Sequence, residues 1–394
     1  MLTMKKLVTP NANYRWILVL GLLLTHSVWA QFTIKGHVFS GKNQEPLPFA
    51  TVFLSGTSKG TLTDSSGQFV LTNLPPGTFD LIVSFVGFTT LKTTLQTQQV
   101  KAYRFILKPL ENNLGEITVK AHRRRDWSKE IALFTDNFIG VTQNAKACRL
   151  LNPSVLRFVD SPSTLEATAP EPLLIENSAL GYRLKFHLDK FTYDYGQQRI
   201  AYQGYPLFEP LPPKNQQQAE EWKANRRKAY LGSLMHFMRA LYQKRLVPEG
   251  FVIQQIAEKK NRAGERRFIG LPTDSTAYFP SLTNSTKQVA YPMAPYKMIL
   301  DSVQSTALRP VIAFNDWIQV TYALKREPAD YQKYRETPEN KYAIIPQRSF
   351  LRMLAPNVEL ESSGRFDLQR IFFEGYWTWE LMAESLPIDY EPGD

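Results

Sequence analysis

Ser233 and His236 are the two residues of this chain whose types and spacing come nearest to a catalytic pair. They stand three positions apart in Tyr230–Tyr242, where apolar residues recur at helical intervals, so we expect them on one helix face. A serine hydrolase also needs a sharp turn at the serine, an oxyanion hole and a carboxylate that orients the histidine. No GxSxG elbow surrounds Ser233. We therefore interpret Ser233 as a residue that lets a helix approach a sheet and His236 as a half-buried hydrogen-bonding residue, with catalysis as the alternative.

The histidines beyond residue 30 do not form a zinc motif. They are His37, His122, His187 and His236, and the residues three positions later are Ser40, Arg125, Lys190 and Arg239. A metallocarboxypeptidase holds zinc with a histidine and a glutamate three positions apart and with a distant second histidine. The chain contains no HxxE, HExxH, CxxC, glycine-rich phosphate loop or calcium loop. The sequence therefore predicts no metal site and no cofactor, and it argues against a zinc peptidase.

Two pairs of nearby carboxylates offer a second kind of hydrolysis. Glu171 with Glu176, or Glu359 with Glu361, would suit a glycoside hydrolase if their carboxyl groups lay about 5 to 9.5 Å apart across a cleft. The chain has 36 acidic residues, so pairs at such short spacing are expected by chance. These pairs stay an alternative source of polymer hydrolysis.

Trp377 and Trp379 are the best candidates for a ligand-binding surface. They lie two positions apart, so on a strand their indole rings would share one face. Flat aromatic rings stack well on the apolar faces of sugars. The two tryptophans therefore predict a platform for a glycan, with burial in the core as the alternative.

Residues 1–30 have the pattern of a secretory signal peptide. Three basic residues accompany the apolar run Trp16–Leu24, and the small residue Ala30 ends the segment, so cleavage is expected before Gln31. The apolar run is shorter than the roughly 20 residues that a spanning helix needs, and no later run reaches that length. We predict an exported chain without a transmembrane span after cleavage; an uncleaved anchor is the alternative.

The charge and cysteine content agree with export. The formal net charge is +11, of which residues 1–30 contribute three. Basic residues gather at Arg123–Arg125 and Lys223–Lys228, which we interpret as a solvated linker and a helix face, with contacts to an anionic polymer as the alternative. Nucleic acid is not an expected partner of an exported protein. Cys148 is the single cysteine, so no internal disulfide can form, and we expect it to pack as a small buried residue.

Residues Phe32–Leu107 predict a small all-β module. Its strand-like runs Ile34–Phe39, Pro46–Leu54, Gly60–Leu71 and Thr78–Phe85 are separated by turn residues at intervals of roughly ten positions. The order of these signals resembles the carboxypeptidase regulatory-like domain, a transthyretin-like seven-stranded β-sandwich common in envelope proteins of Bacteroidota. The resemblance covers residues 31–110, about a fifth of the chain. It implies an envelope protein and names no reaction.

Residues 111–127 predict a linker or an extra strand. Within them, Leu114–Val119 resembles the segment that follows the same module in SusC-like TonB-dependent receptors. In those receptors an energising partner adds to the segment as a β-strand. No plug pattern follows here, so a strand that closes or extends the sandwich is the other interpretation.

Residues 128–394 predict an α+β region of mostly antiparallel strands with one long helix. We predict two short helices at Ser128–Phe138 and Asn144–Leu151, and a polar helix-favouring stretch from Gln216 that leads into a helix at Tyr230–Tyr242. A hairpin should pair Leu180–Tyr193 with Gln198–Phe208, with a slip in the alternation after Leu188, and further strands are expected at Phe251–Ile256, Val311–Leu324, Tyr342–Ile345 and Phe350–Glu361. Leu271–Ala294 should form a loop and Asp389–Asp394 a free tail.

The same region resembles the companion region of this module in many uncharacterised Bacteroidota proteins. The resembling residues are Leu180–Tyr182, Tyr230, Gly232–Ser233, His236–Phe237 and Gly250–Phe251. That family has no agreed activity, so the resemblance supports fold and compartment alone.

The sequence as a whole predicts a non-enzymatic binding or scaffold protein of the periplasm, the outer membrane or the cell surface. Its expected partners are an envelope protein, bound through a sandwich edge or Leu114–Val119, or a glycan. One alternative is a hydrolase of envelope polymer that uses Ser233 and His236 or an acid pair. A second alternative is a TonB-linked accessory protein.

Overall fold

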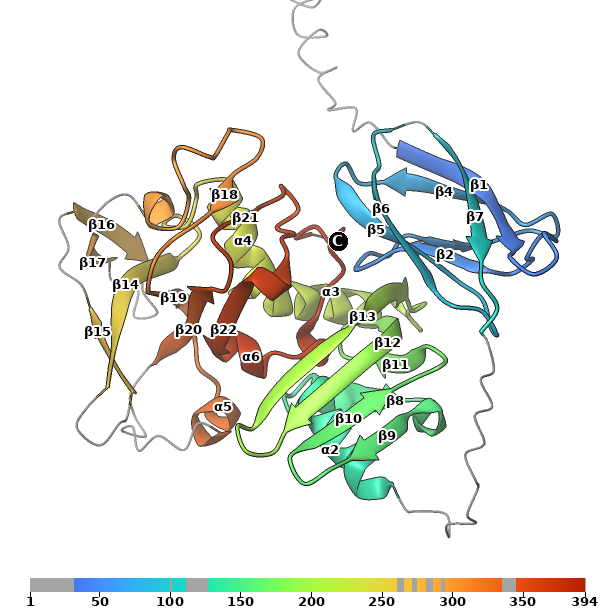
Figure 1. Cartoon of the computed structure of the whole chain (residues 1–394). Helices are drawn as coiled ribbons and strands as arrows, with labels where there is room; N and C mark the ends of the chain where they lie inside the picture. The colour runs from blue at the N-terminus through green and yellow to red at the C-terminus, as the bar shows by residue number, and fades with distance from the viewer. Residues whose placement is uncertain are drawn as a thin grey trace, which may run out of the picture.

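The computed structural model describes residues 32–99, 101–110, 127–260, 266–270, 275–280, 286–291, 295–334 and 345–393. The predicted signal peptide (residues 1–30), Leu114–Val119 and most of the predicted strand Tyr342–Ile345 lie outside these residues. Figure 1 shows three main bodies of strands: a sandwich (blue to teal), a middle sheet (green) and a C-terminal sheet (yellow to red). The predicted fold class, a β-sandwich followed by a larger, mostly antiparallel α+β region, is confirmed.

The N-terminal sandwich has the seven strands that the sequence predicts. They are β1 (Phe32–Ser40), β2 (Thr51–Leu54), β3 (Gly60–Leu62), β4 (Gln68–Leu74), β5 (Thr78–Ser84), β6 (Leu91–Gln96) and β7 (Ala102–Leu107). One sheet has the order β4-β1-β7 and the other the order β3-β2-β5-β6. In β1, buried Ile34, Gly36 and Val38 alternate with exposed residues, so one face of each sheet builds a shared core.

The middle sheet has the order β8-β11-β12-β10-β9, with β13 paired to the other side of β12. Its strands are β8 (Cys148–Leu150), β9 (Arg157–Asp160), β10 (Thr164–Thr168), β11 (Leu173–Asn177), β12 (Tyr182–Asp194) and β13 (Arg199–Pro210). The predicted hairpin is confirmed, and the register shift between Leu188 and Lys190 is the slip that the hydrophobic pattern indicated. The helix α2 (Ser128–Phe138) has the predicted bounds and buries Phe134 and Phe138 in the core of this sheet.

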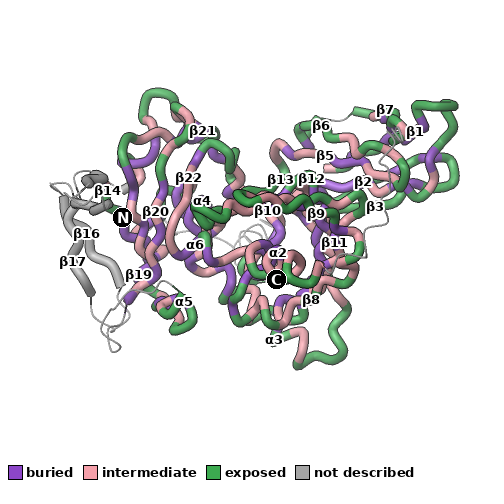
Figure 2. The backbone as a smooth tube through the Cα atoms, turned by 60° about the horizontal axis from the view of Figure 1, so that its bottom comes forward, coloured by how far each residue is buried: buried purple, intermediate pink, exposed green. Residues whose placement is uncertain are grey.

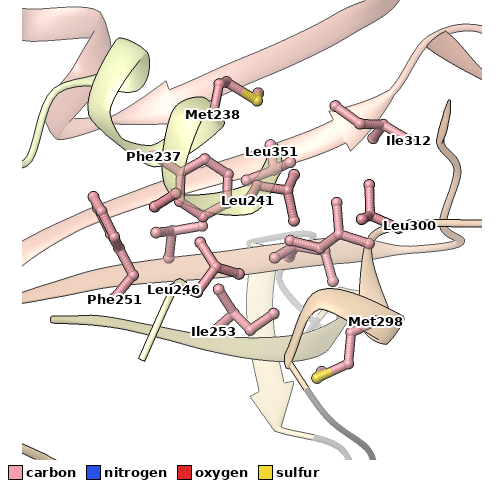
Figure 3. Packing of buried hydrophobic residues seen from close by; sticks show 14 of the residues in the cluster. Phe237, Met238, Leu241, Leu246, Phe251, Ile253, Met298, Leu300, Ile312 and Leu351 are labelled. Atoms are coloured by element: carbon pink, nitrogen blue, oxygen red, sulfur yellow. The ribbon is translucent and has the colours of Figure 1, made fainter. Parts of the chain in front are cut away.

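The C-terminal sheet has the order β15-β14-β19-β20-β22. Its strands are β14 (Phe251–Lys260), β15 (Arg266–Gly270), β19 (Trp317–Arg326), β20 (Pro346–Met353) and β22 (Ile371–Gly375); smaller pairs are β16 (Ser275–Pro280) with β17 (Thr286–Tyr291) and β18 (Val311–Ile312) with β21 (Val358–Glu359). Helix α4 (Leu234–Tyr242) lies on this sheet, and Figure 3 shows Phe237, Met238 and Leu241 packed against Phe251 and Leu351. Figure 2 shows buried residues along the strands and exposed residues on many connecting turns.

Several predicted elements differ from the structure. The predicted helix Asn144–Leu151 is a 3-10 turn at Ala145–Ala147 followed by β8. The predicted loop Leu271–Ala294 contains the β16–β17 hairpin, because its β-branched and aromatic residues favour strands between the turn residues. Two further short helices are α5 (Ala329–Tyr334) and α6 (Tyr376–Trp379). No described helix is both long and apolar enough to cross a membrane.

The predicted helix Tyr230–Tyr242 also differs, since the chain forms α3 (Gln216–Tyr230) and then begins α4 only at Leu234. Gly232 separates the two helices with a φ of +84°, a left-handed conformation that favours glycine. A Cβ atom there would lie 2.6 Å from the Tyr322 ring, so the close approach of this turn to β19 also requires glycine.

The sandwich docks on the middle sheet through the outer face of β2 and β5. Phe53 and Ile82 of the sandwich form a buried cluster with Leu207 of β13. The imidazole of His187 stacks on Phe53 with ring centroids 5.2 Å apart, and burial lowers the pKa of His187 to about 4. The β2–β3 turn also extends the β13 edge, because the Phe208 N–H donates to the Thr57 carbonyl at 3.0 Å. The two parts of the chain thus share a buried interface.

Residues 387–390, which we call the C-terminal strap, connect this interface to α4. The Ile388 N–H donates to the Gly56 carbonyl at 2.7 Å, and an Asp389 carboxylate oxygen accepts from the Ser58 N–H at 2.8 Å. The prediction of a free tail from Asp389 was wrong for the strap, since Tyr390 is 2% exposed. Local sequence patterns do not reveal this anchoring, because the partners of the strap lie in the β2–β3 turn and α4, far away along the chain.

Arg239 of α4 holds the strap. Its guanidinium donates to the carbonyls of Ile388, Tyr390 and Ser363 at 2.8 to 2.9 Å, and the residue is 6% exposed. A guanidinium presents its N–H donors in a fixed fork, so one side chain can bind three carbonyls at once.

We expect Arg239→Ala to lower the free energy of unfolding by about 3 kcal/mol, because three carbonyls lose a charged donor in a buried site. Urea unfolding followed by circular dichroism measures this change. Arg239→Lys should recover little, since an ammonium cannot span the three carbonyls. Arg227→Ala, on the exposed side of α3, is the control and should change the value by less than about 0.5 kcal/mol. Equal effects of Arg239→Ala and Arg227→Ala would contradict this role.

Candidate functional site

A cavity of about 720 Å³ lies between α3, α4 and the C-terminal end of the described chain. Lys223 and Tyr230 of α3, His236 and Arg239 of α4, and Glu249 are among the residues that line it. Pockets of this size that combine aromatic and convergent polar groups are the usual place for a small ligand. The cavity is therefore a candidate ligand-binding site, and it includes one residue that the sequence analysis singled out, His236.

His236 forms the buried end of this cavity. Its Nδ1 accepts a hydrogen bond from the Gly232 N–H at 3.1 Å, and its Nε2 lies 3.4 Å from Oε2 of Glu249. The rings of Tyr230 and Phe251 lie at 4.8 Å from the imidazole, by their centroids. Burial lowers the pKa of His236, and the Glu249 carboxylate opposes that shift. The ring is therefore neutral at pH 7, with its proton on Nε2, where it faces Glu249.

Ser233 has a different task, which is to cap the first turn of α4. Its Oγ accepts from the backbone N–H of His236 at 3.2 Å, as an N-cap serine does. The structure thus brings Ser233 and His236 together through the backbone, while Gly232 and Glu249 occupy the two ring nitrogens. A serine nucleophile needs its hydroxyl on a ring nitrogen of the histidine, and this arrangement does not provide that contact.

The residues that carried the resemblance in the second region meet around α3 and α4. The Trp222 ring lies over Gly181, where an added Cβ atom would come within 2.3 Å of the indole. Nε1 of Trp222 donates to the Ser178 carbonyl at 2.8 Å, which fixes α3 on the β11–β12 turn. Gly250 has a φ of +87° directly before β14, beside Leu324. Gly181, Trp222 and Gly250 thus position the helices around His236, while Tyr230 and His236 line the cavity.

We expect Ser233→Ala to lower the free energy of unfolding by about 1 kcal/mol, because the first turn of α4 loses its cap. Ser233→Asp should restore stability, since aspartate caps helices as well as serine does. Thermal unfolding of the three proteins measures the effect. If Ser233 were a nucleophile, Ser233→Asp would lose hydrolytic activity even where it keeps the stability of the wild type. An Asp variant as unstable as the Ala variant would contradict the capping role.

Trp377 and Trp379 lie in α6, a helical turn, and not on a strand. Gly375 ends β22 with a φ of +86°, and the chain then turns. Nε1 of Trp377 donates to the Gly232 carbonyl at 2.9 Å, and Trp379 packs between Tyr331 and Tyr376. The two tryptophans are 8% and 6% exposed, so the structure places neither of them in an open platform for sugars.

Of the four carboxylates considered for hydrolysis, Glu176, Glu359 and Glu361 form ion pairs, and Glu171 is exposed. Glu176 pairs with Arg149 and Arg183 beside the middle sheet, and Glu359 pairs with Arg309 at 2.7 Å. Among the residues that the structure describes, no three His, Cys, Asp or Glu side chains gather as a metal site. Cys148 packs against the core of the middle sheet, and burial raises the pKa of its thiol to about 12.

Glu380 is a buried carboxylate that sequence reasoning missed. It follows Trp379, lies 3.7 Å from Nζ of Lys325 and interacts with Tyr376. Burial raises the pKa of Glu380 from 4.5 to about 7, although Lys325 acts in the opposite direction. The one sequence signal of its burial was its position after an aromatic run. This signal does not distinguish Glu380 from the many exposed glutamates of the chain.

Glu380 should make stability depend on pH. Its folded-state pKa is raised, so between about pH 4.5 and 7 Glu380 binds more protons in the folded protein than in the unfolded chain, and its contribution to the free energy of unfolding falls as the pH rises. We expect a loss of up to about 3 kcal/mol from this group across that interval. His187, whose pKa is lowered, contributes the opposite slope over part of this interval, so the test compares the two proteins: in urea unfolding the stability of wild type relative to Glu380→Gln should fall as the pH rises, and the exposed Glu221→Gln should keep the wild-type profile. Parallel profiles for wild type and Glu380→Gln would contradict the expectation.

Comparison with known proteins agrees with the architecture of the N-terminal module. Residues 34–119 match the family model of the CarboxypepD_reg-like domain, so the sandwich is a domain of this kind. The match includes Leu114–Val119. Over 123 residues the chain is 28% identical to TonB-dependent receptor P39 of Formosa agariphila, which covers 30% of this chain. The chain spans 12% of that receptor's length, so the likeness concerns a small part of the receptor.

Solved structures give weaker likenesses. One is a chain of a type II cohesin–X-dockerin complex from Acetivibrio cellulolyticus, with 21% identity over 20% of this chain and 58% of that chain and a TM-score of 0.16. Another is a DUF3823 family protein from Bacteroides ovatus, with 9% identity over 46% of this chain and 82% of that chain and a TM-score of 0.15. Both scores lie below 0.5, and we base no interpretation on them.

Proposed function

We propose that this protein is a non-enzymatic binding scaffold of the cell envelope. The observation that carries this proposal is the docking of the sandwich. One sheet of the regulatory-like domain is buried against β12 and β13 through Phe53, Ile82 and Leu207, while the opposite sheet keeps its outer face exposed. A module fixed in this way presents one defined surface to a partner, and fixing a surface in advance reduces the entropy lost on binding.

Two further observations support a place in the envelope. Residues 1–30 have the composition of a secretory signal, and a 123-residue stretch of the chain is similar to part of a TonB-dependent receptor. The surroundings of His236 support a binding role over hydrolysis, since both ring nitrogens already have partners and Ser233 caps a helix.

The proposal predicts binding to envelope material without turnover. Purified residues 31–394 should sediment with outer-membrane fragments or peptidoglycan sacculi and should release no soluble sugar or peptide from them. A basic protein of similar net charge serves as the control for adsorption by charge alone. Absence of sedimentation above that control would refute the scaffold. Release of fragments that stops in His236→Ala would replace it by the hydrolase alternative.

The match to a receptor favours one second candidate, a TonB-linked accessory protein. The segment Leu114–Val119 falls inside the residues that match the family model. A synthetic peptide of residues 111–121 should then bind the energising partner of such receptors by strand addition. Failure of the peptide to bind, with a receptor peptide as positive control, would remove this candidate.

A further inference from the structure

The exposed face of the sheet β4-β1-β7 carries cations beside apolar side chains. We define this outer face by Lys35, His37, Phe39, Val70, Arg104 and Ile106. The register places them in rows, since Lys35 lies opposite Val70 on β4, His37 lies opposite Arg104 on β7, and Phe39 lies opposite Ile106. All six point away from the sandwich core, and the sheet itself is turned away from the docked interface.

The outer face holds no carboxylate. The other outward positions of its three strands are threonine, glutamine, asparagine and alanine. The nearby acids lie at its ends: Asp64 accepts hydrogen bonds from Ser66 and Gln68 in the turn before β4 and interacts with His37, and Glu45 accepts from Asn43 in the loop after β1. Among the described residues, Lys35 has no ion-pair partner, and Arg104 contacts Gln44 and the ring of Phe39.

Phe39 and Arg104 are already arranged for a ligand. The guanidinium of Arg104 lies 4.5 Å from the centroid of the Phe39 ring, and the His37 imidazole stacks on the same ring with centroids 6.1 Å apart. Stacking restricts the side chain of Arg104 while leaving N–H donors available. Val70 and Ile106 are 44% and 42% exposed, so the face also offers apolar area between the cations.

We propose that this outer face binds an acidic polysaccharide, with Lys35 and Arg104 on its carboxylates and Val70 and Ile106 against its sugar rings. The proposal rests on the proposed scaffold function and names the class of ligand that the exposed sheet of the scaffold would bind. A carboxylate is the acceptor that a guanidinium binds best, and the C–H faces of sugars pack on apolar side chains. Arg104 lies opposite His37, two positions along β1 from Lys35, so the two cations are offset by about 7 Å along the strand direction and an extended polymer can reach both.

The test is affinity electrophoresis of residues 31–394 in gels that contain polygalacturonate, neutral dextran or polyphosphate. We expect retardation by polygalacturonate alone, weakening as salt rises. Lys35→Glu/Arg104→Glu should lower the affinity at least about tenfold, since it removes two charge-assisted contacts. Val70→Ser/Ile106→Ser keeps all charges and should also weaken binding. Retardation by polyphosphate as strong as by polygalacturonate would overturn the role of the sugar rings.

Lys129→Glu/Lys228→Glu is the matched control. These lysines are exposed on α2 and α3, have no ion-pair partner among the described residues, and change the net charge by the same amount. The control should bind as wild type does, and all variants should keep the wild-type melting temperature. Equal loss in control and outer-face variants would overturn the proposal in favour of net charge. A chain that sediments with envelopes but ignores polygalacturonate would sink this inference and leave the scaffold function standing.

Discussion

The guanidinium of Arg239 is the contact on which the arrangement of this protein depends. Arg239 belongs to α4, the helix that packs on the C-terminal sheet, and its guanidinium binds the carbonyls of Ile388 and Tyr390 in the C-terminal strap. The strap in turn holds the β2–β3 turn of the sandwich through Gly56 and Ser58. Through the strap, one buried cation thus connects α4 to the sandwich. Carbonyls satisfy this cation because a guanidinium can donate to several acceptors in fixed directions.

This linkage makes the sandwich part of a layered structure and gives its two sheets different surroundings. The sheet β3-β2-β5-β6 has a core on one face and the middle sheet on the other, which explains why Phe53 and Ile82 are buried although they point away from the sandwich core. The sheet β4-β1-β7 has a core on one face alone. Its free face carries Lys35 and Arg104, and binding by the sandwich can occur there without disturbing the interface.

The residues that the sequence suggested for catalysis or ligand binding instead fix the turn between two helices. Ser233, His236 and Trp377 all meet at Gly232, where α3 ends and α4 begins: Gly232 donates to His236, Ser233 caps α4, and Trp377 donates to the Gly232 carbonyl. A buried turn leaves backbone groups that need partners, and polar side chains nearby supply them. A short sequence spacing cannot distinguish such a structural cluster from a catalytic one, because both place a serine and a histidine close together.

Local patterns in the sequence determined the seven-stranded sandwich, the helix Ser128–Phe138 and the β12–β13 hairpin with its slip at Leu188, since these depend on periodicity and turn residues within a few positions. Tertiary structure alone decided the break at Gly232, the burial of Trp377 and Trp379, and the raised pKa of Glu380. It also decided that Asp389 and Tyr390 are anchored and not free. Each of these depends on contacts with residues distant along the chain, and the desolvation and hydrogen bonding that result exist only once the layers are assembled.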